Sequence, residues 1–315
     1  MDPVTHGIAG AAVAVAAGAD VSVSSPFLVA AILGAVSPDL DIIFQYWGDY
    51  IYLKHHRGIS HSLPGLLCFA ALIGGTLHFV FPQYGIILLG LWALLGALSH
   101  TFLDLLNSYG VMLFYPFSKK KYTLNLLMIS DPVLIAASVL TIYGGYRGAT
   151  FLIYPALGIN ISYLFLRFLM RRRAEALIKG YYSGYLERLV VMPAFIGLVK
   201  WDFIVSLNHK NIVGQINLLT CKIKIHKKLK LVAEEIKEEL EKTKMGKIFK
   251  EFTPFCHIGY KVENNRLIGR FTDLRYFVRD RFLHHATVIL NPDDHQVEKA
   301  VFQPYTLNNN IEIKS

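Results

Sequence analysis

The sequence predicts an α-helical membrane bundle of about six transmembrane helices, followed by a small α+β domain. Of its 315 residues, 53% are hydrophobic and only 17% are charged, whereas a soluble chain is usually about 25% charged. The charge deficit lies almost entirely in residues 1–170, which hold long apolar runs. Charge density becomes ordinary at Arg171, so we expect a transmembrane domain over 1–170 and a cytoplasmic α+β domain over 171–315.

Six segments of the first region are predicted to be helices. A spanning helix needs about 20 mostly apolar residues. Residues 129–146 meet this length moderately and residues 4–20 are the weakest, because that segment begins with polar residues. Its small side chains suit packing against other helices. The remaining four segments meet the length well: 26–47, 63–82, 84–106 and 149–170.

Loop charges predict the orientation of the bundle. The side that holds the N-terminus also carries loops 48–62 and 107–128 and the segment after 170. These contain eight basic residues near the helix ends, whereas the short loops of the opposite side contain one basic residue, Arg147. The positive-inside rule then places both termini in the cytoplasm. We attribute the net charge of +9 to this bias and to anionic lipid, not to nucleic acid. The basic residues on the N-terminal side are Lys54, Arg57, Lys119, Lys120, Lys121, Arg171, Arg172 and Arg173.

The region after Arg173 alternates predicted strands with one helix. An amphipathic helix is expected over 230–251, where Glu234, Glu238 and Lys242 follow one another at i,i+4 spacing. The strands are expected where β-branched and aromatic residues gather between turn signals. They are 187–199, 201–209, 211–221, 255–263, 266–279 and 286–291. The sequence leaves the role of this domain open, including that of a partner-binding module.

Four short polar clusters interrupt the apolar first region. Ionisable residues in membrane segments are costly, so they indicate a functional site. On the predicted topology, all four clusters lie at the cytoplasmic ends of their helices. They are Thr5-His6, Ser37-Pro38-Asp39-Leu40-Asp41, the segment from His55 to Ser62, and His100-Thr101-Phe102-Leu103-Asp104.

The ionisable side chains of these clusters are mainly histidines and aspartates, which are metal-ligand types. His100 and Asp104 lie four residues apart on a helix and therefore share one face. A mononuclear catalytic zinc site takes three protein ligands and water, so the eight candidate ligands suffice for two divalent ions, which we expect to be zinc, with manganese as the alternative. Each cluster alone also fits a structural role, and the choice between His55 and His56 stays open. The candidate ligands are His6, Asp39, Asp41, His55, His56, His61, His100 and Asp104.

Arg57 stands among the candidate ligands, where a guanidinium is suited to hold an anionic oxygen such as phosphate. We therefore expect Arg57 and Asp41 to be the catalytic side chains of a hydrolase for a phosphoester, which would be lipid-linked if the site opens at headgroup depth. Membrane lipids are the expected partners, and the oligomeric state stays open. A metal transporter or sensor would use the same ligands, but the opposite ends of the helices hold His78 and little else polar.

The order and spacing of these motifs resemble a known family, the bacterial membrane-bound metal-dependent hydrolases, or YdjM-like inner-membrane proteins. The resemblance covers about residues 1–170 and implies a metal-dependent hydrolase. It extends distantly to zinc phospholipase C and the single-strand nucleases related to it. This chain differs from those enzymes, which use three zinc ions, because it has one His-x-x-x-Asp motif and begins with Met1 in place of an aromatic amine ligand. The motifs are Thr5-His6 with Gly10, Ser37-Pro38-Asp39-Leu40-Asp41, His56 to Ser62, Ser99 to Asp104, Ser108-Tyr109-Gly110, Pro116-Phe117-Ser118 and Asp131-Pro132.

Overall fold

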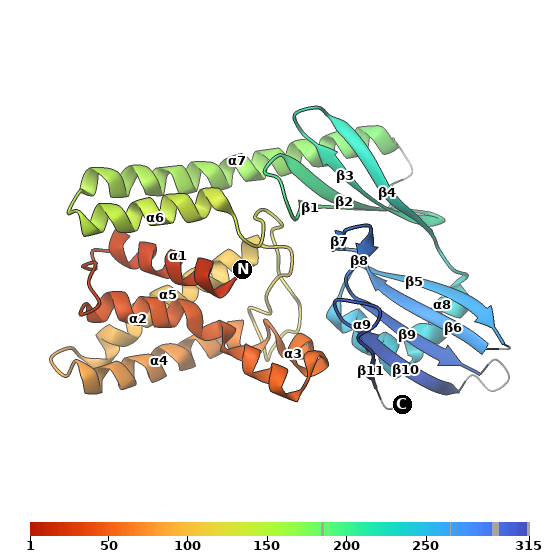
Figure 1. The fold of residues 1–315 in the computed structure, drawn as a ribbon, viewed down its shortest axis with the longest axis horizontal. Coiled ribbons are helices and arrows are strands. Elements are labelled where there is room, and N and C mark those ends of the chain that lie inside the picture. The colour runs from red at the N-terminus through yellow and green to blue at the C-terminus, as the bar shows by residue number, and fades with distance from the viewer. Residues whose placement is uncertain (184–185, 265, 292–295, 314–315) are drawn as a thin grey trace. The chain divides into compact units, whose positions relative to one another are not determined.

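The computed structural model describes residues 1–183, 186–264, 266–291 and 296–313 (Figure 1). Its contacts divide the chain into two compact units. The first comprises Met1–Tyr46 and His55–Arg171, and the second comprises Trp47–Lys54 and Arg172–Ser315. The sequence predicts residues 47–54 within the membrane domain, but the structure assigns them to the second unit. The reason is that Leu53 is buried in the hydrophobic core of that unit.

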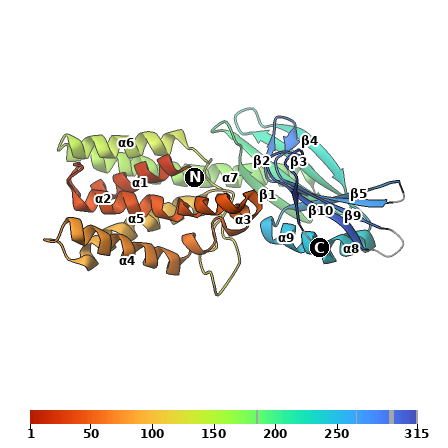
Figure 2. The same cartoon turned by 60° about the horizontal axis from the view of Figure 1, so that its bottom comes forward.

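The first unit is a bundle in which α1, α2, α4, α5 and α6 lie side by side (Figures 1 and 2). Several helices begin at a capping side chain followed closely by proline, a combination that satisfies free N–H groups and presets the first turn. Asp2, Ser25, Ser62 and Asp131 are these caps. The elements are α1 (Pro3–Ala16), α2 (Pro26–Val36), the 3₁₀ segment η1 (Ser37–Trp47), the 3₁₀ turn η2 (Ile59–His61), α4 (Leu63–Val80), α5 (Ile86–Leu106), α6 (Pro132–Tyr146) and α7 (Thr150–Tyr182). The last residue of η1 and the residues of α7 after Arg171 belong to the second unit.

All six predicted apolar segments contain helices, but they differ in length. Among the residues that the structure describes, four helical segments are long and apolar enough to cross a membrane: Pro26–Trp47, α4, α5 and α7. The helices α1 and α6 have 14 and 15 residues. At 1.5 Å per residue they reach about 21–23 Å, less than the roughly 30 Å of a hydrocarbon core. Four spans are therefore supported by length, whereas six were expected.

Small residues bring α2 and α5 into close contact, and this contact positions the polar clusters. A Cβ atom added to Gly34 would lie 1.9 Å from the carbonyl oxygen of Ala93, and one added to Gly96 would lie 1.9 Å from that of Ala31. Only glycine permits backbones to approach this closely, as in other membrane helix pairs. The ends of α2 and α5 therefore meet, and each carries one of the polar clusters.

The second unit contains two antiparallel sheets. The first is a meander of β1 (Arg188–Pro193), β2 (Lys200–Leu207), β3 (Lys210–Asn217) and β4 (Lys222–Lys230). In the second, the strand order is β11-β10-β9-β6-β5. The helices α8 (Glu234–Lys242) and α9 (Lys244–Phe252) lie against one face of it (Figure 2). Its strands are β5 (Cys256–Glu263), β6 (Arg266–Asp273), β9 (His285–Leu290), β10 (Val297–Gln303) and β11 (Ile311–Glu312), and β7 (Phe277–Val278) pairs separately with β8 (Arg281–Phe282).

A third helix, α3 (Asp49–His55), lies mostly within the segment that belongs to the second unit. Leu53 shares a hydrophobic cluster with Leu240 of α8, Phe249 of α9 and Phe302 of β10. The amide of Asn309 also donates a hydrogen bond of 3.0 Å to the Asp49 carboxylate. The chain thus leaves the first unit at Tyr46, contributes to the core of the second, and returns at His55, next to the predicted site motif.

Candidate metal centre

Five of the eight predicted ligands converge at one end of the bundle. His6 lies in the first turn of α1, Asp39 in η1, His61 at the end of η2, and His100 and Asp104 in the last two turns of α5. Within the described chain, their donor atoms form two groups, each with all atoms within 4.8 Å of one another: His6, Asp39 and His100, and His61, His100 and Asp104. Because both groups include His100, we call the five residues together the His/Asp cluster.

Short distances within the His/Asp cluster show how closely its donor atoms approach. The rings of His6 and His100 are stacked with centroids 3.5 Å apart, and Nε2 of His100 lies 3.0 Å from Nε2 of His61. Nε2 of His6 lies 3.3 Å from the Asp104 carboxylate. Asp39 completes the cluster, 3.6 Å from Nε2 of His100 and 3.7 Å from Nε2 of His61. Four of the five side chains are fully buried, and that of Asp39 is 11% exposed.

Hydrogen bonds outside the cluster orient two of its histidines. Nδ1–H of His100 donates to the carbonyl oxygen of Ala35 over 2.7 Å. Nδ1 of His61 lies 2.9 Å from the Ser60 hydroxyl and 3.6 Å from the Asp41 carboxylate. Both rings therefore direct Nε2 toward the cluster. Metal-binding histidines typically use the second nitrogen in this way, because the outer hydrogen bond fixes the tautomer and raises ligand basicity.

The donor atoms of the cluster also include polar atoms that lack a hydrogen bond. Both ring nitrogens of His6 and Oδ2 of Asp39 and Asp104 are buried and make no hydrogen bond in the described part of the chain, although Nε2 of His6 lies 3.3 Å from the Asp104 carboxylate and Oδ2 of Asp104 lies 3.1 Å from Nε of Arg57. Such groups are rare in proteins, because the energy of desolvation is not recovered. A divalent cation would satisfy imidazole nitrogens and carboxylate oxygens together, and this donor set suits zinc and other first-row divalent ions. The residues present therefore fit a metal site.

Charge within the cluster is consistent with a place for a cation. Burial acts to lower the pKa of His61, but the nearby carboxylates of Asp104 and Asp39 outweigh it and raise that pKa. The Asp104 carboxylate is also paired with Nε of Arg57 at 3.1 Å and with the α-amino group of Met1, so cationic groups already lie around it. A histidine ligates a metal in its neutral form.

Arg57 reaches the cluster from an unusual backbone conformation. Its φ of +61° lies in the left-handed region, which non-glycine residues adopt mainly where surrounding contacts impose it. Here the Arg57 N–H donates to Asp41 over 3.0 Å, and the Arg57 carbonyl accepts from Met112 over 3.1 Å. Its Nε lies 3.1 Å from the Asp104 carboxylate, and Nη1 is buried without a hydrogen bond to any described residue. One guanidinium donor is therefore available to a ligand.

The other three predicted ligands lie beside the His/Asp cluster and outside both donor groups. Nδ1 of His56 lies 3.0 and 3.1 Å from the two carboxylate oxygens of Asp41. Burial is the main cause of the lowered pKa of His56, and the Asp41 carboxylate opposes that shift. His55 is exposed, with its ring 5.2 Å from that of Phe44.

Several contacts of the site were not apparent from the sequence. The Ser60 hydroxyl donates a hydrogen bond of 3.2 Å to Asp41 and contacts His61. Serine is not among the metal-ligand types from which the site was predicted. The Ala35 carbonyl is a backbone group and leaves no signal in a sequence. The α-amino group of Met1 pairs with the Asp104 carboxylate. Ser60 at least lies inside the motif from His55 to Ser62, so its position could have indicated a supporting role.

Comparisons with known proteins match two parts of the chain separately. The YdjM inner membrane protein family matches residues 1–174, and the YfhP C-terminal alpha/beta plait domain matches residues 235–311. A relative from Bacillus subtilis (strain 168), described as "Uncharacterized protein YfhP", is 30% identical over 226 residues, which cover 68% of each chain. No solved structure matches the chain. The comparisons give no support to the distant similarity with zinc phospholipase C and its related nucleases.

Proposed function

The chain belongs to the YdjM inner membrane protein family, and from this premise we propose that it is a membrane-bound, metal-dependent hydrolase of a phosphoester. The observation that supports this most is the junction of two donor groups at His100. Burying histidines and aspartates in an apolar bundle costs free energy, so such a cluster indicates a functional site.

The metal-binding residues in this proposal are the five members of the His/Asp cluster, which would hold two divalent ions, zinc or manganese. Such ions make water more acidic and polarise a phosphoryl oxygen. Asp41 and Ser60 keep Nε2 of His61 directed toward the cluster, so they are positioning residues. Nδ1 of His56 lies 3.0 Å from the Asp41 carboxylate and helps to hold it in place.

Arg57 has the substrate-binding role in this proposal. Its buried Nη1 donor and its place 3.1 Å from Asp104 suit a phosphate oxygen next to the cluster. In the reaction, the water oxygen forms a bond to phosphorus and the ester P–O bond breaks. The alcohol leaves with the proton that the water gives up. Arg57 would orient the phosphate for this attack and balance its negative charge.

The alternative function, a metal transporter or sensor, has less support. In the described residues, both donor groups lie at the same end of the bundle. His78, which the sequence places toward the opposite end, uses Nδ1 to donate to the Tyr84 carbonyl over 2.8 Å. A transport path would require further polar side chains along the bundle, and the hydrolase proposal does not.

Metal content and hydrolysis test the proposed function. We expect the full chain, purified in detergent without chelator, to contain zinc or manganese. It should hydrolyse at least one member of a panel of phosphate monoesters and diesters. A chelator should abolish this activity, and added metal should restore it. A protein that binds neither metal nor any phosphoester would contradict the proposal, whereas tight metal binding without hydrolysis would favour the sensor.

The proposed location of the site is the cytoplasmic face of the membrane, with both termini in the cytoplasm. The motivation is the eight-to-one basic bias of the loops. We expect a reporter that is fluorescent only in the cytoplasm to be active when fused after Arg173. A periplasm-specific phosphatase fused at the same position should stay inactive. The reverse pattern would place the cluster on the outer face and contradict the assignment.

A further inference from the structure

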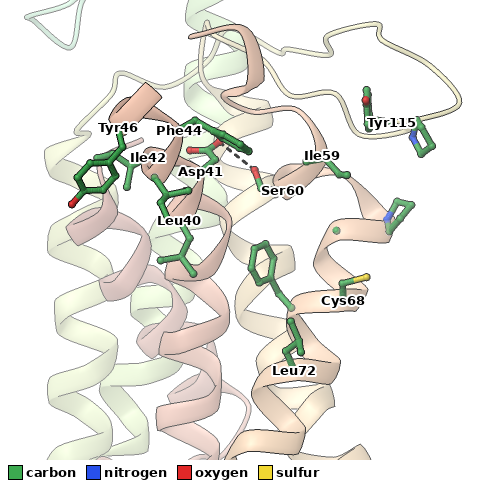
Figure 3. Close-up of a pocket in the computed structure, with 15 residues that line it drawn as sticks. Leu40, Asp41, Ile42, Phe44, Tyr46, Ile59, Ser60, Cys68, Leu72 and Tyr115 are labelled. Carbon is green, nitrogen blue, oxygen red and sulfur yellow. Dashed lines mark hydrogen bonds between the residues drawn. The ribbon is translucent and has the colours of Figure 1, made fainter. Parts of the chain in front are cut away.

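An open apolar groove lies beside the His/Asp cluster, within the first unit. Its volume is about 720 Å³, in the range of pockets that bind small organic molecules. Apolar side chains of η1, η2 and α4 form its walls, among them Leu40, Ile59 and Leu72 (Figure 3). Tyr115 and Pro116 of the loop after α5 complete the lining.

The polar groups of this groove connect it with the site. Asp41 and Ser60 both line it, and their side chains point toward one another (Figure 3). The Ser60 hydroxyl donates to Asp41 over 3.2 Å and contacts Nδ1 of His61, a member of the His/Asp cluster. A molecule in the groove would therefore have one end next to the site.

The groove continues along α4, away from these polar groups. A second apolar depression of about 330 Å³ shares Leu40, Phe69 and Leu72 with it and extends to Leu77. From Pro64 to Leu77 the helix advances about 20 Å at 1.5 Å per residue. The two depressions together thus form a long surface that is lined almost entirely by apolar side chains, with polar groups mainly at the end near the site.

These features favour a hydrocarbon chain as the occupant. A peptide segment would bring backbone N–H and C=O groups to a surface that offers almost no partners, and leaving them unpaired is costly. A compact polar molecule would not use the apolar length. We propose that the groove binds the hydrocarbon chain of a lipid phosphoester whose phosphate lies at Arg57 and the His/Asp cluster. This inference rests on the proposed function and specifies its substrate class.

Two leucines of α4 provide a matched pair of variants. Leu72 lines the groove and is 66% exposed, whereas Leu67 is 58% exposed and is not part of the lining. Phosphate esters of ethanol, octanol and hexadecanol would be compared in nanodiscs. We expect kcat/KM of the normal chain to rise about tenfold or more from ethyl to hexadecyl ester. Leu72→Trp should lower kcat/KM for the hexadecyl ester and so remove most of this preference, and Leu67→Trp should retain the preference.

A second measurement does not require hydrolysis. Cys68 lines the groove and is exposed, so its alkylation by a maleimide can be followed by peptide mass spectrometry. Hexadecylphosphonate has no ester bond, and it should slow this alkylation several-fold, whereas ethylphosphonate and uncharged hexadecanol should not. Slowing by hexadecanol as well would show general lipid coverage and overturn the inference.

The two measurements separate this inference from the proposed function. Protection of Cys68 by hexadecylphosphonate, without hydrolysis of any ester, would support a lipid phosphate site and contradict the hydrolase. Equal hydrolysis of short and long esters by the normal chain and by Leu72→Trp would overturn the groove as the substrate site and leave the hydrolase in place. Absence of both protection and hydrolysis would overturn both.

Discussion

Asp104→Asn is expected to remove most of the bound metal and to lower hydrolysis by a factor of about 10³ or more, because residues that act as a unit each cost nearly the whole effect. The Asp104 carboxylate is fully buried and lies within 3.1–3.4 Å of Arg57, His6 and His61. Asparagine preserves the shape but loses the charge, so it is a poor ligand. His100→Ala should act in the same way, since His100 belongs to both donor groups.

A second buried aspartate provides the control for this prediction. Asp131 is fully buried, caps α6 and accepts a hydrogen bond of 2.8 Å from Tyr163, but it lies in neither donor group. Asp131→Asn should therefore leave metal content and activity near normal. Elemental analysis and initial rates on the three variants, all checked for membrane insertion, decide the matter. Normal metal content in Asp104→Asn would exclude the cluster as the metal site.

The end of the bundle at which the site lies could be predicted from the sequence, because histidine and aspartate stand out where nearly every neighbour is apolar. The starts of several helices could also be predicted, since a capping residue precedes α2 and α6 and a proline begins each of them. The sequence did not predict which five of the eight candidate ligands form the His/Asp cluster and which three lie outside it. This division depends on the close crossing at Gly34 and Gly96 and on His61, whose two nitrogens face different carboxylates, Asp39 and Asp41.

In the second unit, three expectations were imprecise, two for local reasons and one for a tertiary reason. The strand β4 alternates lysine with Ile223, Ile225 and Leu229, a period-2 pattern typical of a half-buried strand, but the predicted strands stopped at residue 221 and missed it. The single helix expected over 230–251 is two helices, because Thr243 ends α8 and its hydroxyl accepts from Gly246 to cap α9. Burial of Leu53 among distant residues has no local signature at all.

Arg57→Ala is expected to retain the metal and to lower turnover about 10²- to 10³-fold, as the loss of one charge-stabilising donor does in other enzymes. The side chain contributes no donor atom to the two metal-binding groups, and its free Nη1 is suited to substrate phosphate. Arg57→Lys should restore activity only in part, because an ammonium is a point charge and cannot form two parallel hydrogen bonds with a phosphate. Metal stoichiometry and steady-state kinetics measure both effects.

The left-handed backbone at Arg57 requires one further variant. An alanine at φ +61° retains a conformational cost of about 1–2 kcal/mol, which glycine does not have. Arg57→Gly therefore removes the guanidinium and relieves the backbone, so equal losses in the alanine and glycine variants would assign the effect to the side chain. Recovery in the glycine variant would instead show that loop geometry limits turnover. If Arg57→Ala loses metal as completely as Asp104→Asn, the separation of metal ligands from phosphate-binding residue is wrong, and Arg57 holds the cluster together.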